Sequence, residues 1–162
     1  MKAGILIRNL LWTLLAPGTV TVYLPWRIVT DWYPAREEFS CHGARLAGVL
    51  PIALGVILLF SCIGRFAVVG EGTLSPLDAP RRLVTGGMYR YVRNPMYLAV
   101  MAILLGESLV FCSIPLAVYS AVCFVVFNLV ILFYEEPALR RRFGRSYRQY
   151  CRKAGRWLPR LS

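Results

Sequence analysis

Residues 97–134, YLAVMAILLGESLVFCSIPLAVYSAVCFVVFNLVILFY, are apolar almost throughout and carry a single charged side chain, that of Glu107. A helix needs about 20 such residues to cross a hydrocarbon core of roughly 30 Å. Pro115 is well placed to begin a second helix, and almost no residues are left to join it to the first. The stretch therefore predicts a tight antiparallel hairpin of two transmembrane helices, at about 97–113 and 115–134.

Two further apolar blocks precede this hairpin and predict helices at about 5–26 and 46–64. The 162-residue chain is 57% hydrophobic and only 17% charged, and its apolar residues fall in long runs. A soluble domain of this size interrupts its apolar runs more often. We therefore predict one membrane domain over residues 1–162, an all-α integral membrane bundle of about four transmembrane helices with a cytoplasmic amphipathic C-terminal helix.

Positive charge gathers at alternate ends of the predicted helices. The net charge is +11, and arginines cluster in the segment 65–96 and again after residue 139. The loop at 27–45 is balanced by acidic residues, and the turn near Ser113 has no basic residue. By the positive-inside rule, both termini and the segment 65–96 should be cytoplasmic. Basic residues beside a membrane also bind anionic lipid headgroups, and we prefer this explanation of the charge to nucleic-acid binding.

The cysteines and the histidine do not indicate a metal centre. The five cysteines are far apart and show no CxxC spacing, and His42 is the only histidine. Structural zinc sites need four Cys or His ligands at regular spacing. We therefore predict neither a disulfide framework nor a metal site.

The basic C-terminal segment carries apolar and aromatic residues at helical spacing: Leu139, Phe143, Tyr147, Tyr150 and Cys151. This pattern is typical of an amphipathic helix that either lies on lipid headgroups or folds back on the protein. A simple anchor explains the pattern as well as a functional role does.

Glu135 and Glu136 follow the last apolar block directly. Two carboxylates at a helix C-terminus oppose both the positive-inside bias and the helix dipole. Salt bridges to the arginines at 140–142 would explain them structurally and contribute only about 0.3–0.5 kcal/mol each. We favour a polar site that binds a cation, an amine or sugar hydroxyls. Glu107 lies near the opposite interface, and we expect a structural role for it.

The segment Arg93-Asn94-Pro95-Met96-Tyr97 begins the first helix of the hairpin. Exposed backbone N–H groups at a helix start favour a carboxylate or phosphate. Because the hairpin is tight, this segment should lie beside Glu135 and Glu136. One pocket would then have donors on one wall and carboxylates on the other, which suits a zwitterion that carries a carboxylate, an ammonium group and a ribose.

The motif RLVTGGMYRYVRNPMY at residues 82–97, followed by Glu135-Glu136, Phe143-Gly144, Tyr147, Tyr150 and Pro159, resembles the isoprenylcysteine carboxyl methyltransferase and phospholipid methyltransferase superfamily. The resemblance extends from residue 70 to the end of the chain. It implies an integral membrane enzyme that takes S-adenosylmethionine from the cytoplasm and methylates a lipophilic acceptor. The acceptor, a lipid amine or an isoprenoid or fatty carboxylate, would enter sideways from the bilayer.

By the same resemblance, the segments 70–97 and 135–160 would form the cofactor site, and Arg81 and Arg82 would make backbone contacts. The implied cofactor-binding residues are Arg81, Arg82, Leu83, Val84, Tyr89, Asn94, Pro95, Met96, Tyr97, Glu135 and Glu136. Tyr97 and Glu136 are the candidate catalytic residues, because an amine acceptor must lose a proton, which Tyr97, Glu136 or water could take.

Two departures from the prenylcysteine enzymes argue against a prenylcysteine acceptor. Asn94 stands where those enzymes have histidine, and Ile131 stands where they carry an arginine for the substrate carboxylate. Asparagine is usual in phospholipid-type and many bacterial members, so we expect a bacterial-type inner membrane.

The main alternative is a non-enzymatic small membrane protein whose basic tail binds anionic lipid or a partner complex. It explains the charge and the helices but leaves the paired motifs as coincidence. A transporter is a weaker alternative, because only Glu107 is a candidate charged group within the bilayer.

Overall fold

The computed structural model describes residues 15–31, 42–69 and 83–160. Their elements in chain order are a π-helical turn η1 (Thr19–Tyr23), α2 (Leu24–Asp31), α3 (His42–Val69), a 3₁₀ turn η2 (Gly87–Arg90), α4 (Pro95–Val110), α5 (Ile114–Val130), a π-helical turn η3 (Ile131–Glu135) and α6 (Glu136–Lys153). In these residues the only β pairing is an isolated bridge between Val92 and Gly155. The predicted all-α fold class is confirmed.

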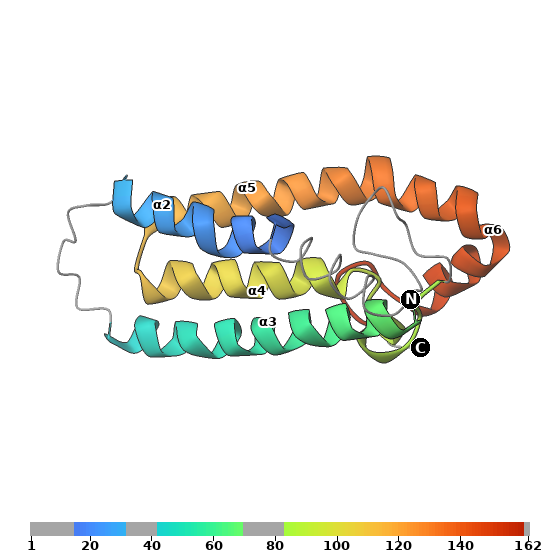
Figure 1. Cartoon of the computed structure of the whole chain (residues 1–162), viewed down its shortest axis with the longest axis horizontal. Helices are drawn as coiled ribbons and strands as arrows, with labels where there is room; N and C mark the ends of the chain where they lie inside the picture. The colour runs from blue at the N-terminus through green and yellow to red at the C-terminus, as the bar shows by residue number, and fades with distance from the viewer. Residues whose placement is uncertain (1–14, 32–41, 70–82, 161–162) are drawn as a thin grey trace.

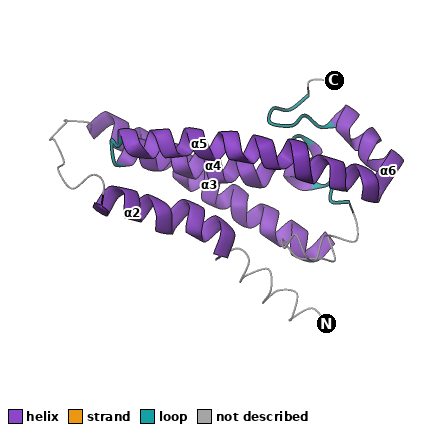
Figure 2. Cartoon of the chain, turned by 90° about the horizontal axis from the view of Figure 1, so that it is seen from above, coloured by secondary structure: helices purple, strands orange, loops and turns teal. Residues whose placement is uncertain are grey.

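Three long helices lie side by side along the length of the molecule, with α4 between α3 and α5 (Figure 1). The η1 turn packs against α4 and α2 packs against α5, so the N-terminal helix joins the same bundle. Figure 2 shows the bundle from above, with α6 at the far end from the α4–α5 turn. The ends of α3 and α5 and the start of α4 therefore meet at one end of the molecule.

Small residues let α3 and α4 approach closely. A Cβ atom added at Gly106 would lie 2.6 Å from the Gly48 carbonyl oxygen, and one at Gly55 would lie 2.7 Å from the Ala99 carbonyl oxygen. Helices that pack in lipid use such glycines because dispersion contacts, not water exclusion, hold them together. The core of the bundle is accordingly lined by α4, through Ala99, Val100, Met101, Ile103 and Leu104.

The outer surfaces of α3 and α5 remain apolar. Two helices among the described residues are long and apolar enough to cross a membrane, with candidate spans Gly43–Arg65 and Ile114–Lys153, and Pro95–Val110 is a shorter apolar helix. Their exposed positions carry large apolar side chains such as Leu54, Phe60 and Val125. Water would disfavour such a surface, and lipid would not.

The predicted hairpin of α4 and α5 is confirmed. The α4 helix ends in a Schellman-type turn, in which the Ser113 N–H donates to the Ser108 carbonyl at 3.0 Å and the Cys112 N–H donates to the Leu109 carbonyl at 3.2 Å. Cys112 adopts φ 47°, the left-handed conformation that this turn requires. Ser113 caps α5 by accepting from the Leu116 N–H, and Pro115 lies in its first turn.

The observed helix bounds differ from the predicted ones, because apolar blocks mark the part of a helix suited to lipid and not its ends. The first helix continues past residue 26 to Asp31, where Arg27 and Asp31 form an i,i+4 ion pair. The second extends from His42 to Val69 instead of 46–64. The third begins at Pro95 and ends at Val110 instead of 97–113.

The C-terminal helix α6 is bent and folds back on the protein. Gly144 interrupts it with φ 51° and ψ −115°, so the second half returns toward the bundle (Figure 1). Glycine tolerates this left-handed backbone without a steric penalty. Tyr147, Tyr150 and Ala154 are then buried against Leu83 and Phe143. Of the two arrangements expected for this helix, the structure shows the one that packs on the protein.

Candidate active site

The start of α4 and the end of η3 meet through Tyr97 and Glu135. The Tyr97 hydroxyl donates to Glu135 Oε1, and the Tyr97 ring packs on Phe127 with centroids 4.8 Å apart. The hairpin brings these residues together, because α4 and α5 run antiparallel from a short turn. The predicted proximity of the Asn94–Tyr97 segment and the double glutamate is therefore confirmed.

The segment before α4 forms a wall beside this pair. Val84 and Tyr89 are buried against Cys62 of α3, and Leu58 and Met96 pack on them. Burial, with a further contribution from Cys62, raises the pKa of the Tyr89 phenol well above its ordinary value, so Tyr89 stays protonated at physiological pH. The Tyr89 carbonyl accepts a hydrogen bond from the Tyr150 hydroxyl at 2.6 Å, which ties this wall to α6.

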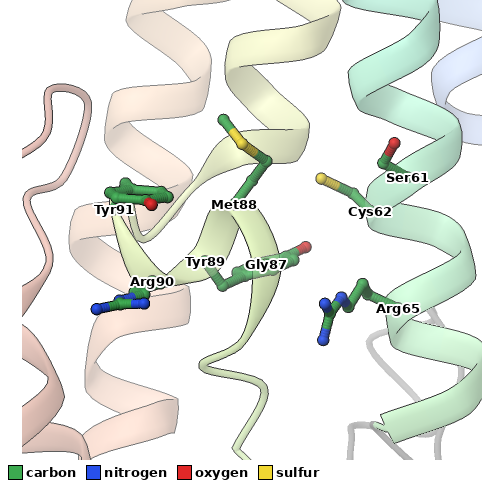
Figure 3. A pocket seen from close by; sticks show the side chains of 8 residues that line it. All are labelled: Ser61, Cys62, Arg65, Gly87, Met88, Tyr89, Arg90 and Tyr91. Atoms are coloured by element: carbon green, nitrogen blue, oxygen red, sulfur yellow. The ribbon is translucent and has the colours of Figure 1, made fainter.

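A cavity of about 520 Å³ opens between this wall and the last turns of α3 (Figure 3). It is lined by Ser61, Cys62, Arg65 and residues 87–91. Tyr89 belongs both to this cavity and to the buried cluster with Val84 and Cys62.

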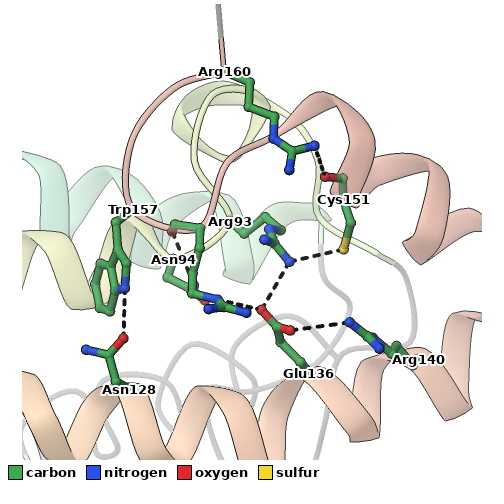
Figure 4. A network of polar contacts seen from close by, with 9 residues as sticks. Arg93, Asn94, Asn128, Glu136, Arg140, Cys151, Trp157 and Arg160 are labelled. Carbon is green, nitrogen blue, oxygen red and sulfur yellow. Dashed lines mark hydrogen bonds and ion pairs between the residues drawn. The ribbon is translucent and has the colours of Figure 1, made fainter.

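Glu136 has a different environment from that of Glu135. Its side chain is 7% exposed, and Oε1 lies 3.1 Å from Arg93 Nη1 and 2.8 Å from Arg156 Nε (Figure 4). Its other oxygen lies 3.6 Å from Arg140, four residues along α6. The i,i+4 ion pair expected from the sequence is present, but the two closer partners, Arg93 and Arg156, come from outside α6. Three arginines thus surround this carboxylate.

The chain after α6 lies along the segment before α4. The Arg93 N–H donates to the Gly155 carbonyl at 2.8 Å, and the Gly155 N–H donates to the Tyr91 carbonyl at 3.2 Å. The Asn94 amide donates to the Arg156 carbonyl at 3.3 Å. Trp157 Nε1 donates to Asn128 Oδ1 at 3.0 Å, which fastens the same turn to α5. We call residues 154–157 the C-terminal strap.

The structure brings most of the predicted site residues to one end of the bundle. Tyr97 and Glu135 contact one another directly, whereas Asn94 and Glu136 contact the strap. Pro95 is fully buried and Met96 partly so. The predicted contacts at Arg81 and Arg82, with the rest of 70–82 in the predicted cofactor segment, lie outside the described residues.

The sequence did not predict the parts that Arg65, Arg156 and Trp157 play. Arg65 gave no signal beyond that of a basic residue at a helix end. Arg156 and Trp157 lie in the segment 135–160 expected to help form the cofactor site, but neither was singled out as a site residue. Arg156 contacts Glu136 across 20 residues of sequence, and Trp157 contacts Asn128 across 29.

Fold and site together define a helical membrane protein with a carboxylate–phenol pair and an ion-pair network at one end of its bundle. A family described as phospholipid methyltransferase matches residues 44–146, which is more than half of the sequence, and the chain belongs to that family. Two curated relatives, from Oryza sativa subsp. indica and subsp. japonica, are each named as a probable protein-S-isoprenylcysteine O-methyltransferase. Each is 29% identical over 121 residues, an alignment that covers 67% of this chain and 60% of the relative's length. No solved structure gives a significant match.

Proposed function

We propose that the protein is an S-adenosylmethionine-dependent methyltransferase of the membrane, which transfers a methyl group to a lipophilic acceptor. Its membership of the phospholipid methyltransferase family supports this activity. The observation that carries the proposal is the pairing of Tyr97 with Glu135 where the segment before α4 meets the end of η3. The acceptor would be a lipid amine or an isoprenoid or fatty carboxylate, reaching the site sideways from the bilayer.

The residues present fit the proposed cofactor. Glu135 is partly buried, and within the described residues its carboxylate accepts from the Tyr97 hydroxyl, which leaves acceptor positions for a cationic group or ribose hydroxyls. Met96, which is partly buried beside Val84 and Tyr89, offers apolar surface for a flat base. When bound, S-adenosylmethionine would supply a methyl group on a positively charged sulfur, open to in-line attack by an oxygen or nitrogen of the acceptor.

Within this site, Tyr97 and Glu136 would do different work. A carboxylate acceptor arrives ionised, but an amine must lose a proton, which the Tyr97 oxygen could take while its own proton passes to the Glu135 carboxylate. Glu136 is held by arginines, so we assign it a positioning role: through Arg93 and Arg156 it would fix the segment that carries Asn94. This revises our expectation of Glu136 as a catalytic candidate.

For the membrane topology we propose four spans: the helix that ends at Asp31, and α3, α4 and α5. The α4–α5 turn has no basic residue, whereas the opposite end carries Arg65, Arg90, Arg93 and the arginines of α6. By the positive-inside rule this basic end and both termini would be cytoplasmic. The exposed arginines of α6 would contact anionic headgroups.

A purely adaptor-like role for the tail fits these contacts less well. Tyr147 and Tyr150 of α6 are buried, and the strap is hydrogen-bonded to the segment before α4. A tail that served only to bind lipid or a partner complex would have no need of these internal contacts.

The direct test is methyl transfer from labelled S-adenosylmethionine to membrane lipid extracts by the purified protein. We expect label in an organic-soluble product, and Glu135→Gln should reduce its rate by roughly 10²-fold or more, as the loss of one preorganised electrostatic group does elsewhere. Glu135→Gln leaves the side-chain length unchanged, and Arg141→Gln, an exposed change on α6, is the control. Equal rates for wild type and Glu135→Gln would contradict the proposed site.

A further inference from the structure

The cavity between α3 and residues 87–91 has the size and position of a second binding site. Its volume of about 520 Å³ lies in the range of sites for small ligands, about 300–1,000 Å³. It shares Tyr89 with the wall of the proposed cofactor site, whereas Glu135 and Tyr97 are not among its lining residues. A ligand there would be a neighbour of the cofactor and not the cofactor itself.

Arg65 points into this cavity from α3. An arginine at a helix end commonly extends to the lipid headgroups, so its place in the sequence alone says little. The orientation of its side chain is more informative, because the guanidinium is directed toward the lining segment at Gly87 (Figure 3) and lies against Gly86 and Gly87. A Cβ atom at Gly86 would lie 2.9 Å from Arg65 Nη1, and one at Gly87 would lie 2.8 Å from Nε. The absence of side chains at these two positions makes room for the guanidinium.

The cavity has positive charge without a counterion in the described residues. Neither Arg65 nor Arg90 takes part in a salt bridge with a carboxylate described by the structure. Among the described residues, Glu135 accepts a hydrogen bond from Tyr97, and Glu136 is paired with its own arginines. A guanidinium presents a planar set of donors that matches the oxygens of a carboxylate or phosphate.

The apolar surface of α3 leads to the same cavity. Ile57 and Ser61 precede Arg65 by eight and four residues, so all three share one face of the helix. Ile57 is 64% exposed, and Leu54, one turn earlier on this surface, is 56% exposed. An acyl or prenyl chain lying on these residues would place its polar end beside Ser61 and Arg65.

We propose that this cavity binds the anionic headgroup of the methyl acceptor, with Arg65 contacting its carboxylate or phosphate oxygens. The identity of the ligand as the acceptor rests on the function proposed above. The site itself rests on the cavity, the guanidinium that lies against Gly86 and Gly87, a positive charge with no counterion among the described residues, and the adjoining apolar face. It narrows the acceptor to a lipid with a negatively charged group next to its chain.

The test is calorimetric titration of the full chain in neutral detergent micelles with three lipid probes. Oleate offers a carboxylate, dioleoylphosphatidylethanolamine offers a phosphate with an amine, and dioleoylglycerol offers neither charge. We expect saturable binding of oleate or of the phospholipid, and none of dioleoylglycerol. Arg65→Gln should weaken that binding by about three- to tenfold, as expected for the loss of one charge-assisted contact at a partly exposed site.

Two further variants separate the headgroup contact from general effects. Gly86→Ala keeps the charge and suits the extended backbone at φ −95° and ψ 167°, but its Cβ would displace the guanidinium. It should weaken lipid binding in the same direction as Arg65→Gln, and it serves if Arg65→Gln fails to fold. Arg141→Gln removes an equal charge from the exposed face of α6 and should leave the affinities unchanged.

The same preparations are titrated with S-adenosylmethionine and with inorganic phosphate as a competitor. Unchanged cofactor affinity in Arg65→Gln, and no displacement of lipid by phosphate, support a lipid headgroup site. Lipid binding that is insensitive to Arg65→Gln and Gly86→Ala overturns the proposal. Full displacement of the bound lipid by free phosphate also overturns it. So does an Arg65→Gln variant that loses affinity for S-adenosylmethionine alone. Wild-type protein that binds the lipids as expected but not S-adenosylmethionine contradicts the methyltransferase proposal and leaves the headgroup site standing.

Discussion

Glu135 and Glu136 are adjacent in sequence, but their carboxylates bind different partners. Glu135 accepts from Tyr97, whereas Glu136 lies among Arg93, Arg140 and Arg156. The π-helical turn Ile131–Glu135 ends at the first of them and changes the rotation per residue just before α6 begins at Glu136. Such turns are frequent at functional sites because they redirect side chains within a continuous helix. A sequence pattern based on 3.6 residues per turn cannot assign the two roles.

At Tyr97, the phenol should matter differently for the two acceptor classes. Tyr97→Phe removes the hydroxyl that donates to Glu135 but keeps the ring that packs on Phe127. If the acceptor is an amine, kcat should fall by roughly 10²-fold or more through loss of proton transfer. If it is a carboxylate, kcat should change far less than the affinity for S-adenosylmethionine. Steady-state rates with matched amine and carboxylate lipids distinguish the cases, and an unchanged kcat and affinity would contradict any role for this hydroxyl.

At Glu136, we expect a loss of stability. Glu136→Gln leaves the Arg93 side chain, 11% exposed, without its carboxylate. Removing one partner of a buried ion pair costs about 3 kcal/mol of unfolding free energy. Thermal unfolding in detergent should show a lowered midpoint for Glu136→Gln. The midpoint of Asp31→Asn, which breaks an exposed pair with Arg27, should be unchanged. Equal midpoints for the two variants would show that the network contributes little.

Among the elements, the contact between α3 and α4 depends on glycine. Gly106→Ala would bring a Cβ to within 2.6 Å of the Gly48 carbonyl, so the helices must move apart at a cost of about 1–3 kcal/mol. Gly64→Ala is the matched control: it lies in α3 with no atom within 4 Å of an added Cβ. There the change should be neutral or stabilising by about 0.5 kcal/mol. Thermal unfolding of the two alanine variants checks this, and indistinguishable midpoints would refute close packing at Gly106.

The positions of the helices could be predicted from the sequence better than the path of the chain after the last apolar helix. The apolar run at 97–134 with Pro115 in its middle predicts the α4–α5 hairpin, because a short turn leaves antiparallel packing as the simple arrangement. The bend at Gly144 was not predicted, since a single glycine also occurs within straight helices. The C-terminal strap was not predicted either, because the hydrogen bonds of Gly155 are made by the backbone and need no particular side chain. For this reason the place of Arg156 and Trp157 at the site follows only from the structure.

In the topology proposed for the whole molecule, the two ends of the bundle lie on opposite sides of a membrane. A variant that keeps Cys112 as its only cysteine should react with a membrane-impermeant maleimide from the outer face of oriented vesicles, since Cys112 lies in the α4–α5 turn. A second variant, with Arg152→Cys in exposed α6 as its only cysteine, should react from the cytoplasmic face. Labelling of both from the same face would contradict the proposed topology, and labelling after detergent solubilisation confirms that both thiols are reactive.

The central claim is that Glu135, at the meeting point of α4 and η3, belongs to a binding site for S-adenosylmethionine. Calorimetric titration of the detergent-purified protein with S-adenosylmethionine and with its demethylated product tests it most directly, with Glu135→Gln alongside. The account predicts saturable binding of both compounds to the wild type and loss of that binding in the variant, with the thermal unfolding midpoint unchanged. A folded wild type that binds neither compound, even with added lipid, or a variant that binds them equally well, would contradict it.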